Sequence, residues 1–138
     1  MDKSFLLDTS AIFVYVESES GHETIEYILI EARQKKCAVF MSFISLMEIY
    51  YISWQKKGED VAKELVVLVK SLPVEIIQSN ERIILSAGRL KAKHRLSVAD
   101  AVVAATAMDK AAVLVHKDPE FEQLERQVAV IKLPYKKI

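Results

Sequence analysis

The sequence predicts an α/β fold, with a central and mostly parallel sheet of about four or five strands flanked by helices on both faces. Short apolar runs of strand length alternate with longer segments whose apolar residues recur at helical spacing. The short runs lack the period-two alternation of a sheet with one solvated face, which favours parallel strands buried on both sides. The chain has 138 residues, 51% of them hydrophobic, with only three glycines and three prolines, so we expect one domain over residues 1–138.

The first half of the chain predicts two strands and four helices. Each predicted strand is a short apolar run, and each helix carries an apolar stripe that ends at basic or helix-breaking residues. A glycine turn at Gly21 separates the first two helices, and Lys57-Gly58 separates the next two. The predicted order is strand 5–7, helix 9–16, helix 22–36, strand 37–40, a helix that starts near Ser42 or Ser45, and helix 59–71.

The second half predicts three more strands. Leu72-Pro73 ends the preceding helix, and Ser79-Asn80 can cap the next one. The helix after Ser97 is so rich in alanine and valine that we expect it to be buried on most sides. The predicted order is strand 74–77, helix 80–95, helix 97–110, strand 112–115, a helical turn over 118–124 and strand 128–131.

Composition excludes few functions but indicates a compartment. Lys plus Arg and Asp plus Glu balance at 19 each, so net charge neither indicates nor excludes a nucleic-acid partner. Cys37 is the single cysteine, and the N-terminus lacks the features of a signal peptide, so we expect a cytoplasmic protein. Residues 37–54 approach the length of a membrane span, but Glu48 lies within them. We expect no membrane insertion.

Four acidic residues occupy positions where function is plausible. Asp8 and Asp118 follow predicted strands, at the edge of the sheet where ligands collect in parallel α/β folds. Glu48 and Asp100 lie within apolar helical segments, early in their helices. All four are therefore expected at the strand-to-helix edge of one layer.

Each acid also has a purely structural interpretation. Ser45-x-x-Glu48 and Ser97-x-x-Asp100 fit the capping-box pattern, and the two strand-end acids can N-cap the helices that follow them. Together, however, four clustered carboxylates repel one another, and no lysine or arginine lies among the apolar neighbours of Glu48 or Asp100. A divalent cation would satisfy all four.

The residue types favour magnesium or manganese over zinc. Mg²⁺ and Mn²⁺ prefer hard oxygen ligands and retain several waters. The three histidines, His22, His94 and His116, show no metal-binding spacing, and a lone cysteine completes no thiolate set. Such a cation can lower the pKa of a bound water and neutralise charge on a phosphate. We therefore expect phosphodiester hydrolysis.

The acids lie in four stretches that resemble the signature stretches of PIN domains, most closely those of VapC toxins: residues 6–11, 46–49, 96–102 and 118–121. The resemblance extends over about residues 5–131. It implies a PIN fold and a Mg²⁺- or Mn²⁺-dependent endoribonuclease, in which Asp8 and Asp100 are the firmest metal ligands. Glu48 and Asp118 would complete the catalytic cluster directly or through waters. Ser10 and Ser97 would support the acids by hydrogen bonds.

The resemblance also implies partners. VapC-like proteins typically form homodimers and are silenced by a VapB-type antitoxin, whose peptide wraps the toxin and reaches its active site. An apolar, aromatic face over residues 49–54 and 61–68 exceeds what a small core needs, so part of it is expected at an interface.

His116 is the one departure from the family pattern. The family usually has threonine or serine two residues before the last acid, so the orienting hydroxyl is missing here. His116 could replace it, contact the substrate or simply end the strand. Lys117 is a candidate for contact with the RNA backbone. Lys93 and Arg95 are further candidates, although their position favours a solvated helix C-terminus that complements the helix dipole.

Three alternatives stay open at this point. A phosphorelay receiver domain is also α/β but needs a phospho-acceptor aspartate after a central strand, and the second and third predicted strands lead to Met41-Ser42 and Gln78-Ser79. A non-catalytic PIN-like protein would bind RNA or a partner only. A DNA nuclease would use the same carboxylate chemistry. For the favoured RNA substrate, our hypothesis is attack by a metal-activated water that leaves 5′-phosphate and 3′-hydroxyl ends.

Overall fold

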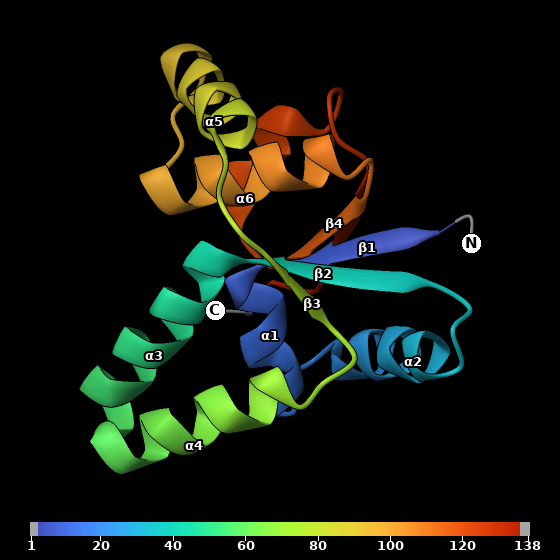
Figure 1. Ribbon diagram of the computed structural model, residues 1–138, viewed down its shortest axis with the longest axis vertical. Coiled ribbons are helices and arrows are strands. Elements are labelled where there is room, and N and C mark those ends of the chain that lie inside the picture. The colour runs from blue at the N-terminus through green and yellow to red at the C-terminus, as the bar shows by residue number, and fades with distance from the viewer. Residues whose placement is uncertain (1–2, 136–138) are drawn as a thin grey trace.

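A five-stranded parallel sheet forms the centre of the computed structural model, which describes residues 3–135 (Figure 1). The strand order is β3-β2-β1-β4-β5, so β1 lies in the middle and pairs with both β2 and β4. Every pairing is parallel, which confirms the predicted class. The strands are β1 (Ser4–Leu7), β2 (Ala38–Ser42), β3 (Glu75–Ile77), β4 (Val113–His116) and β5 (Val130–Lys132).

Helices cover both faces of this sheet, as predicted. In Figure 1, α5 and α6 lie above the strands, and α1 to α4 lie below them. The helices are α1 (Thr9–Val16), α2 (His22–Arg33), α3 (Phe43–Lys57), α4 (Glu59–Lys70), α5 (Glu81–Lys93) and α6 (Val98–Asp109), with a short 3₁₀ helix η1 (Pro119–Leu124).

The alternating side chains of the central strands form two separate cores. In β1, Leu6 packs with α5, α6 and η1, whereas the next residue, Leu7, packs with α1, α2 and α3. β4 repeats this division with Leu114 and Val115. Side chains on both faces of β1 and β4 are therefore buried, which explains why residues 5–7 and 113–115 are apolar without alternation.

Of the two predicted starts of α3, the structure confirms the one near Ser42, whereas the predicted end of β2 at residue 40 was wrong. β2 extends to Ser42, which pairs with Ile77 of β3, and Ser42 then caps α3 by accepting a hydrogen bond from the Ile44 amide at 3.2 Å. Ser45 is therefore no cap, and its buried hydroxyl has no hydrogen-bond partner among residues 3–135. The capping-box interpretation of Glu48 fails for the same reason, because Glu48 is the sixth residue of α3.

The long apolar run over residues 37–54 is divided between two elements. Cys37 is buried ahead of β2, and the remainder forms β2 and most of α3. Across residues 3–135, no helix combines the length and the apolar character of a membrane span.

The pairing of β1 with β4 places two chain segments side by side at the carboxyl edge of the sheet. The Asp8 amide, just past β1, donates a hydrogen bond to the Val115 carbonyl of β4 at 3.0 Å. Loops that leave these two strands therefore begin next to each other, and Asp8 and Asp118 lie in them.

Candidate metal centre

All four acids predicted from the sequence line one pocket at the carboxyl edge of the sheet. They come from four separate segments: Asp8 after β1, Glu48 in α3, Asp100 in α6 and Asp118 after β4. The fold therefore brings together carboxylates that are far apart in the sequence.

Asp8 is held by the first turn of α1. Its Oδ2 accepts hydrogen bonds from the Ser10 amide at 3.0 Å and from the Ser10 hydroxyl at 2.5 Å, so Ser10 supports this acid. The residue is only 2% exposed, and among residues 3–135 no donor reaches its buried Oδ1. Burial raises the pKa of Asp8 to about 6, although the two bonds from Ser10 oppose that effect.

Glu48 is oriented by a residue that the sequence analysis did not single out. The Thr9 hydroxyl, at the start of α1, donates a 2.6 Å hydrogen bond to Glu48 Oε1. Ile52 and Lys56, four and eight residues after Glu48 on the same face of α3, line the pocket as well. Lys56 could have been identified from the sequence, because its spacing from Glu48 places both on one face of a helix. The sequence gives no comparable signal for Thr9.

Asp100 lies in the first turn of α6 and is 7% exposed. Burial raises its pKa, and side-chain hydrogen bonds with the Asp118 and Glu120 carboxylates and the nearby charge of Asp8 raise that pKa further. Ser97 caps the helix, and its hydroxyl accepts a hydrogen bond from the Asp100 amide at 3.1 Å. Burial and crowding thus favour protonation of Asp100 when no cation is bound.

His116, at the position where a hydroxyl is usual, contacts the backbone of the last acid. Its Nδ1 accepts a hydrogen bond from the Asp118 amide at 3.0 Å, so the neutral ring carries its proton on Nε2. The ring is fully buried and packs edge-on against Phe121, with centroids 5.0 Å apart. Burial lowers the pKa of His116, which favours this neutral form. His116 therefore holds the backbone of Asp118, and it is not among the residues that line the acidic pocket.

Asp118 starts η1 as the sequence predicts. Its Oδ1 accepts a hydrogen bond from the Glu120 amide at 3.0 Å, with Pro119 at the first helical position. One carboxylate oxygen each from Asp100, Asp118 and Glu120 lies within 4.8 Å of the others. Glu120 is thus a further acid at this site, and the sequence analysis missed it because an acidic residue in a first helical turn is ordinary.

The candidate RNA contacts divide into two groups. Lys117 lines the pocket and pairs with Glu19 at 2.9 Å, while Ser10 accepts a hydrogen bond from its amide. Lys93 and Arg95 do not line it. Lys93 is the last residue of α5. Arg95 lies two residues further on, where the Gln123 side chain bonds to both its amide and its carbonyl.

The donor set fits a hard divalent cation. The side chains that converge on the pocket include four carboxylates, and the buried Oδ1 of Asp8 has no hydrogen-bond partner among residues 3–135. A buried carboxylate oxygen without a donor is costly, and a bound cation removes that cost. The groups suit Mg²⁺ or Mn²⁺ better than zinc, because they are hard oxygen ligands.

Comparison with known proteins gives the family. The model of the PIN domain matches residues 5–127. The chain belongs to the PIN domain family. No curated protein matches the chain.

Solved structures share the fold of this PIN domain. VapBC2 from Rickettsia felis, bound to a promoter DNA fragment, has a TM-score of 0.76 at 17% identity and covers 95% of this chain and 99% of its own. DNA-bound VapBC from Salmonella typhimurium has a TM-score of 0.75 at 19% identity, and the match covers 94% of this chain and 98% of that chain. Mycobacterium tuberculosis VapC20, a toxin that cleaves the sarcin-ricin loop, has a TM-score of 0.67 at 18% identity. The match covers 86% of this chain and 93% of that chain.

The phosphorelay alternative lacks its essential residue. β2 ends at Ser42 and leads directly into α3, and β3 ends at Ile77 and is followed by Gln78. Neither strand is followed by an aspartate that could accept a phosphoryl group.

Proposed function

We propose that this PIN domain is a metal-dependent endoribonuclease of the VapC type, acting in the cytoplasm. The observation that carries the proposal is the convergence of four carboxylates on one pocket, where the buried Asp8 Oδ1 has no donor within the described part of the chain. The similar structures support the choice of RNA, since one of them is a toxin that cleaves the sarcin-ricin loop.

Asp8 and Asp100 would hold Mg²⁺ or Mn²⁺, with Glu48 and Asp118 completing the site directly or through waters. The bound cation would supply a water of lowered pKa and neutralise charge on the phosphate. Thr9 and Ser10 fix the Glu48 and Asp8 carboxylates by hydrogen bonds. Lys117 and Lys56, at the wall of the same pocket, are suited to contact the RNA backbone.

The experiment is cleavage of a mixed RNA pool by purified protein with Mn²⁺, comparing the parent with Asp100→Asn. The matched control is Asp60→Asn, which removes an exposed acid in the first turn of α4. We expect the parent and the control to cut and Asp100→Asn to be inactive while still folded. Equal cleavage by all three would show that the activity lies elsewhere or is a contaminant.

End-group analysis tests the chemistry. The metal-activated water predicts 5′-phosphate and 3′-hydroxyl products. Products with 2′,3′-cyclic phosphates would mean that the ribose hydroxyl was the nucleophile. Competition with a DNA strand of the same sequence tests the choice of sugar, and we expect RNA to be cut preferentially.

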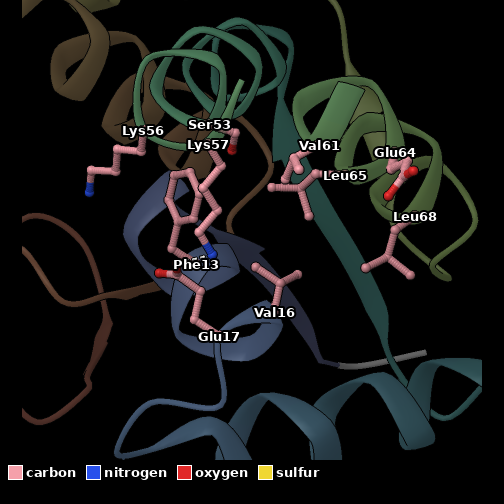
Figure 2. Close-up of a pocket in the computed structure, with 10 residues that line it drawn as sticks. All are labelled: Phe13, Val16, Glu17, Ser53, Lys56, Lys57, Val61, Glu64, Leu65 and Leu68. Carbon is pink, nitrogen blue, oxygen red and sulfur yellow. Dashed lines mark ion pairs between the residues drawn. The ribbon is translucent and has the colours of Figure 1, made fainter. Parts of the chain in front are cut away.

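A VapB-type antitoxin is the proposed partner, and a groove beside the acids is suited to its peptide. Figure 2 shows this groove between α1, which contributes Phe13 and Val16, and α4, which contributes Val61, Leu65 and Leu68. Its volume is about 240 Å³, and its floor is largely apolar.

The groove is continuous with the acidic pocket. Phe13, Glu17 and Lys56 line both, and Figure 2 shows Lys56 pointing away from the apolar side chains of α4. An extended peptide with apolar side chains in the groove could therefore continue over the carboxylates and block them. Neighbours with the same fold are toxin-antitoxin complexes, which supports this assignment.

Leu65→Glu tests the groove, because a carboxylate there meets an apolar surface. We expect the variant to lose its co-expressed antitoxin on size-exclusion chromatography while retaining RNA cleavage. Glu64→Gln, at the rim of the same groove, is the control that should retain the complex. Retention of the antitoxin by Leu65→Glu would place the peptide elsewhere.

A homodimer is the second proposed assembly. The outer face of α3 and α4 exposes several large apolar side chains, including Val67 at 69% and Trp54 at 44%. Phe43, Leu46, Met47 and Tyr50 line an apolar hollow of about 530 Å³ beside Val67. Exposed apolar area of this kind marks interfaces. We expect a dimer by light scattering and a monomer for Val67→Glu; a dimeric variant would contradict the assignment.

A further inference from the structure

The N-terminus of α6 is capped by side chains from two distant segments. Ser97 supplies one half of the expected capping box, because its hydroxyl accepts the Asp100 amide. The second hydrogen bond of the capping box is made by a different residue. Glu120 Oε1, from η1, accepts a hydrogen bond from the Ser97 amide at 3.0 Å. In a local capping box, the Asp100 carboxylate would take that bond.

Glu120 thereby leaves the Asp100 carboxylate available for the pocket. Asp100 lines the pocket with Asp8 and Asp118, and no donor of its own helix is bound to its carboxylate within residues 3–135. The backbone of Glu120 also donates to Asp118 Oδ1 at 3.0 Å. One residue thus connects both acids: its amide holds Asp118, and its side chain holds the helix end that carries Asp100.

We propose that Glu120 is a positioning residue, which keeps the Asp100 carboxylate turned toward the metal by binding the Ser97 amide, and that Glu120 is not itself a metal ligand. The inference rests on the proposed function, because it assumes that Asp100 binds the cation. Without the Glu120 side chain, the Ser97 amide lacks its acceptor, and the Asp100 carboxylate is the group that the capping-box geometry supplies in its place. Asp100 then turns away from the pocket.

Three substitutions at Glu120 separate positioning from ligation. Glu120→Gln keeps an oxygen that can accept the Ser97 amide but removes the charge. Glu120→Asp keeps the charge but shortens the side chain by one methylene, which takes the carboxylate out of reach of that amide. Glu120→Ala removes both. Glu122→Ala is the control, because Glu122 lies in the same 3₁₀ helix and contacts Tyr135 and Lys132 instead.

The measurement is Mn²⁺ affinity by isothermal titration calorimetry on the folded chain, with unfolding in EDTA recorded for each variant. Loss of a residue that orients a ligating carboxylate typically weakens metal binding by about 10-fold or more. We expect that loss for Glu120→Ala and Glu120→Asp. Glu120→Gln and Glu122→Ala should stay within about twofold of the parent, since neither disturbs a ligand's support.

The alternatives give different patterns. If Glu120 ligates the metal, Glu120→Gln loses as much affinity as Glu120→Ala. If its role is only structural, the variants lose stability in EDTA and keep the affinity of the parent. Either pattern overturns the inference while leaving the proposed function intact. A parent that binds no Mn²⁺ would instead overturn the metal centre, and this inference with it.

Discussion

Replacing Asp8 by asparagine should stabilise the metal-free protein at neutral pH and remove its response to metal. The pKa of Asp8 rises from 3.8 to about 6 on folding because the carboxyl is buried. Since the folded value is the higher one, Asp8 contributes stability that is fully present below pH 3.8 and is lost as the pH rises through about 6. At about 1.4 kcal/mol per pH unit, the charged form costs the fold about 3 kcal/mol at pH 7.5.

Asparagine avoids this cost because it is neutral at every pH and has the same shape. Its Oδ1 can accept both hydrogen bonds from Ser10, and its amide group can donate to the carboxylates that surround it. In EDTA at pH 7.5 we expect a free energy of unfolding higher by up to about 3 kcal/mol, or a Tm higher by roughly 10 °C. The advantage should shrink as the pH falls from about 6 toward 3.8.

Unfolding by urea or heat, in EDTA and in Mn²⁺, is the assay. Mn²⁺ should stabilise the parent, because it binds the folded state only, and should leave the variant unchanged. Two results would refute the reasoning. An asparagine variant less stable than the parent in EDTA would mean that the buried charge is not costly, and an equal gain from Mn²⁺ would mean that Asp8 is not a ligand.

Three further substitutions test individual contacts. Thr9→Val keeps the shape of the side chain but removes the hydrogen bond to Glu48. We expect kcat/KM for RNA to fall about fivefold, equivalent to about 1 kcal/mol, with no change in Tm. An unchanged kcat/KM would show that Thr9 has no role in the site. Ser42→Ala should lower the free energy of unfolding in urea by about 1 kcal/mol, because it removes the N-cap of α3, whereas Ser45→Ala should leave it unchanged. A larger loss for Ser45→Ala than for Ser42→Ala would favour Ser45 as the cap. Gly88→Ala should stabilise α5 by up to about 1 kcal/mol in the same assay, because the added methyl meets nothing within 4 Å, and a loss of stability would show hidden crowding there.

Much of the fold could be predicted because its signals are local. The strand ahead of Asp8 and the helix after Ser97 are continuous apolar runs, and burial on both faces of a parallel sheet requires such runs. The order of the strands could not be predicted, because it depends on which apolar faces pack together across the whole chain. The end of β2 was misplaced for a related reason: Ser42 continues the strand by pairing with Ile77 of β3.

The acids of the candidate site could be predicted where they stand at the ends of strands. Asp8 and Asp118 were found because each follows a strand, and parallel strands end at one edge of the sheet. Glu120 and Thr9 were missed because their roles arise from contacts across 23 and 39 positions of sequence. His116 was recognised as unusual, but only the structure shows its ring nitrogen bound to the Asp118 amide.

The adjacency of β1 and β4 has a consequence for how the protein is made. The two strands place Asp8 beside Asp118, which follows it by 110 residues, and the pair cannot meet until β4 has been synthesised. During translation, a nascent chain that ends before residue 118 therefore carries only part of the carboxylate set, however well its earlier helices have formed. The complete carboxylate set can therefore assemble only after Asp118 has left the ribosome.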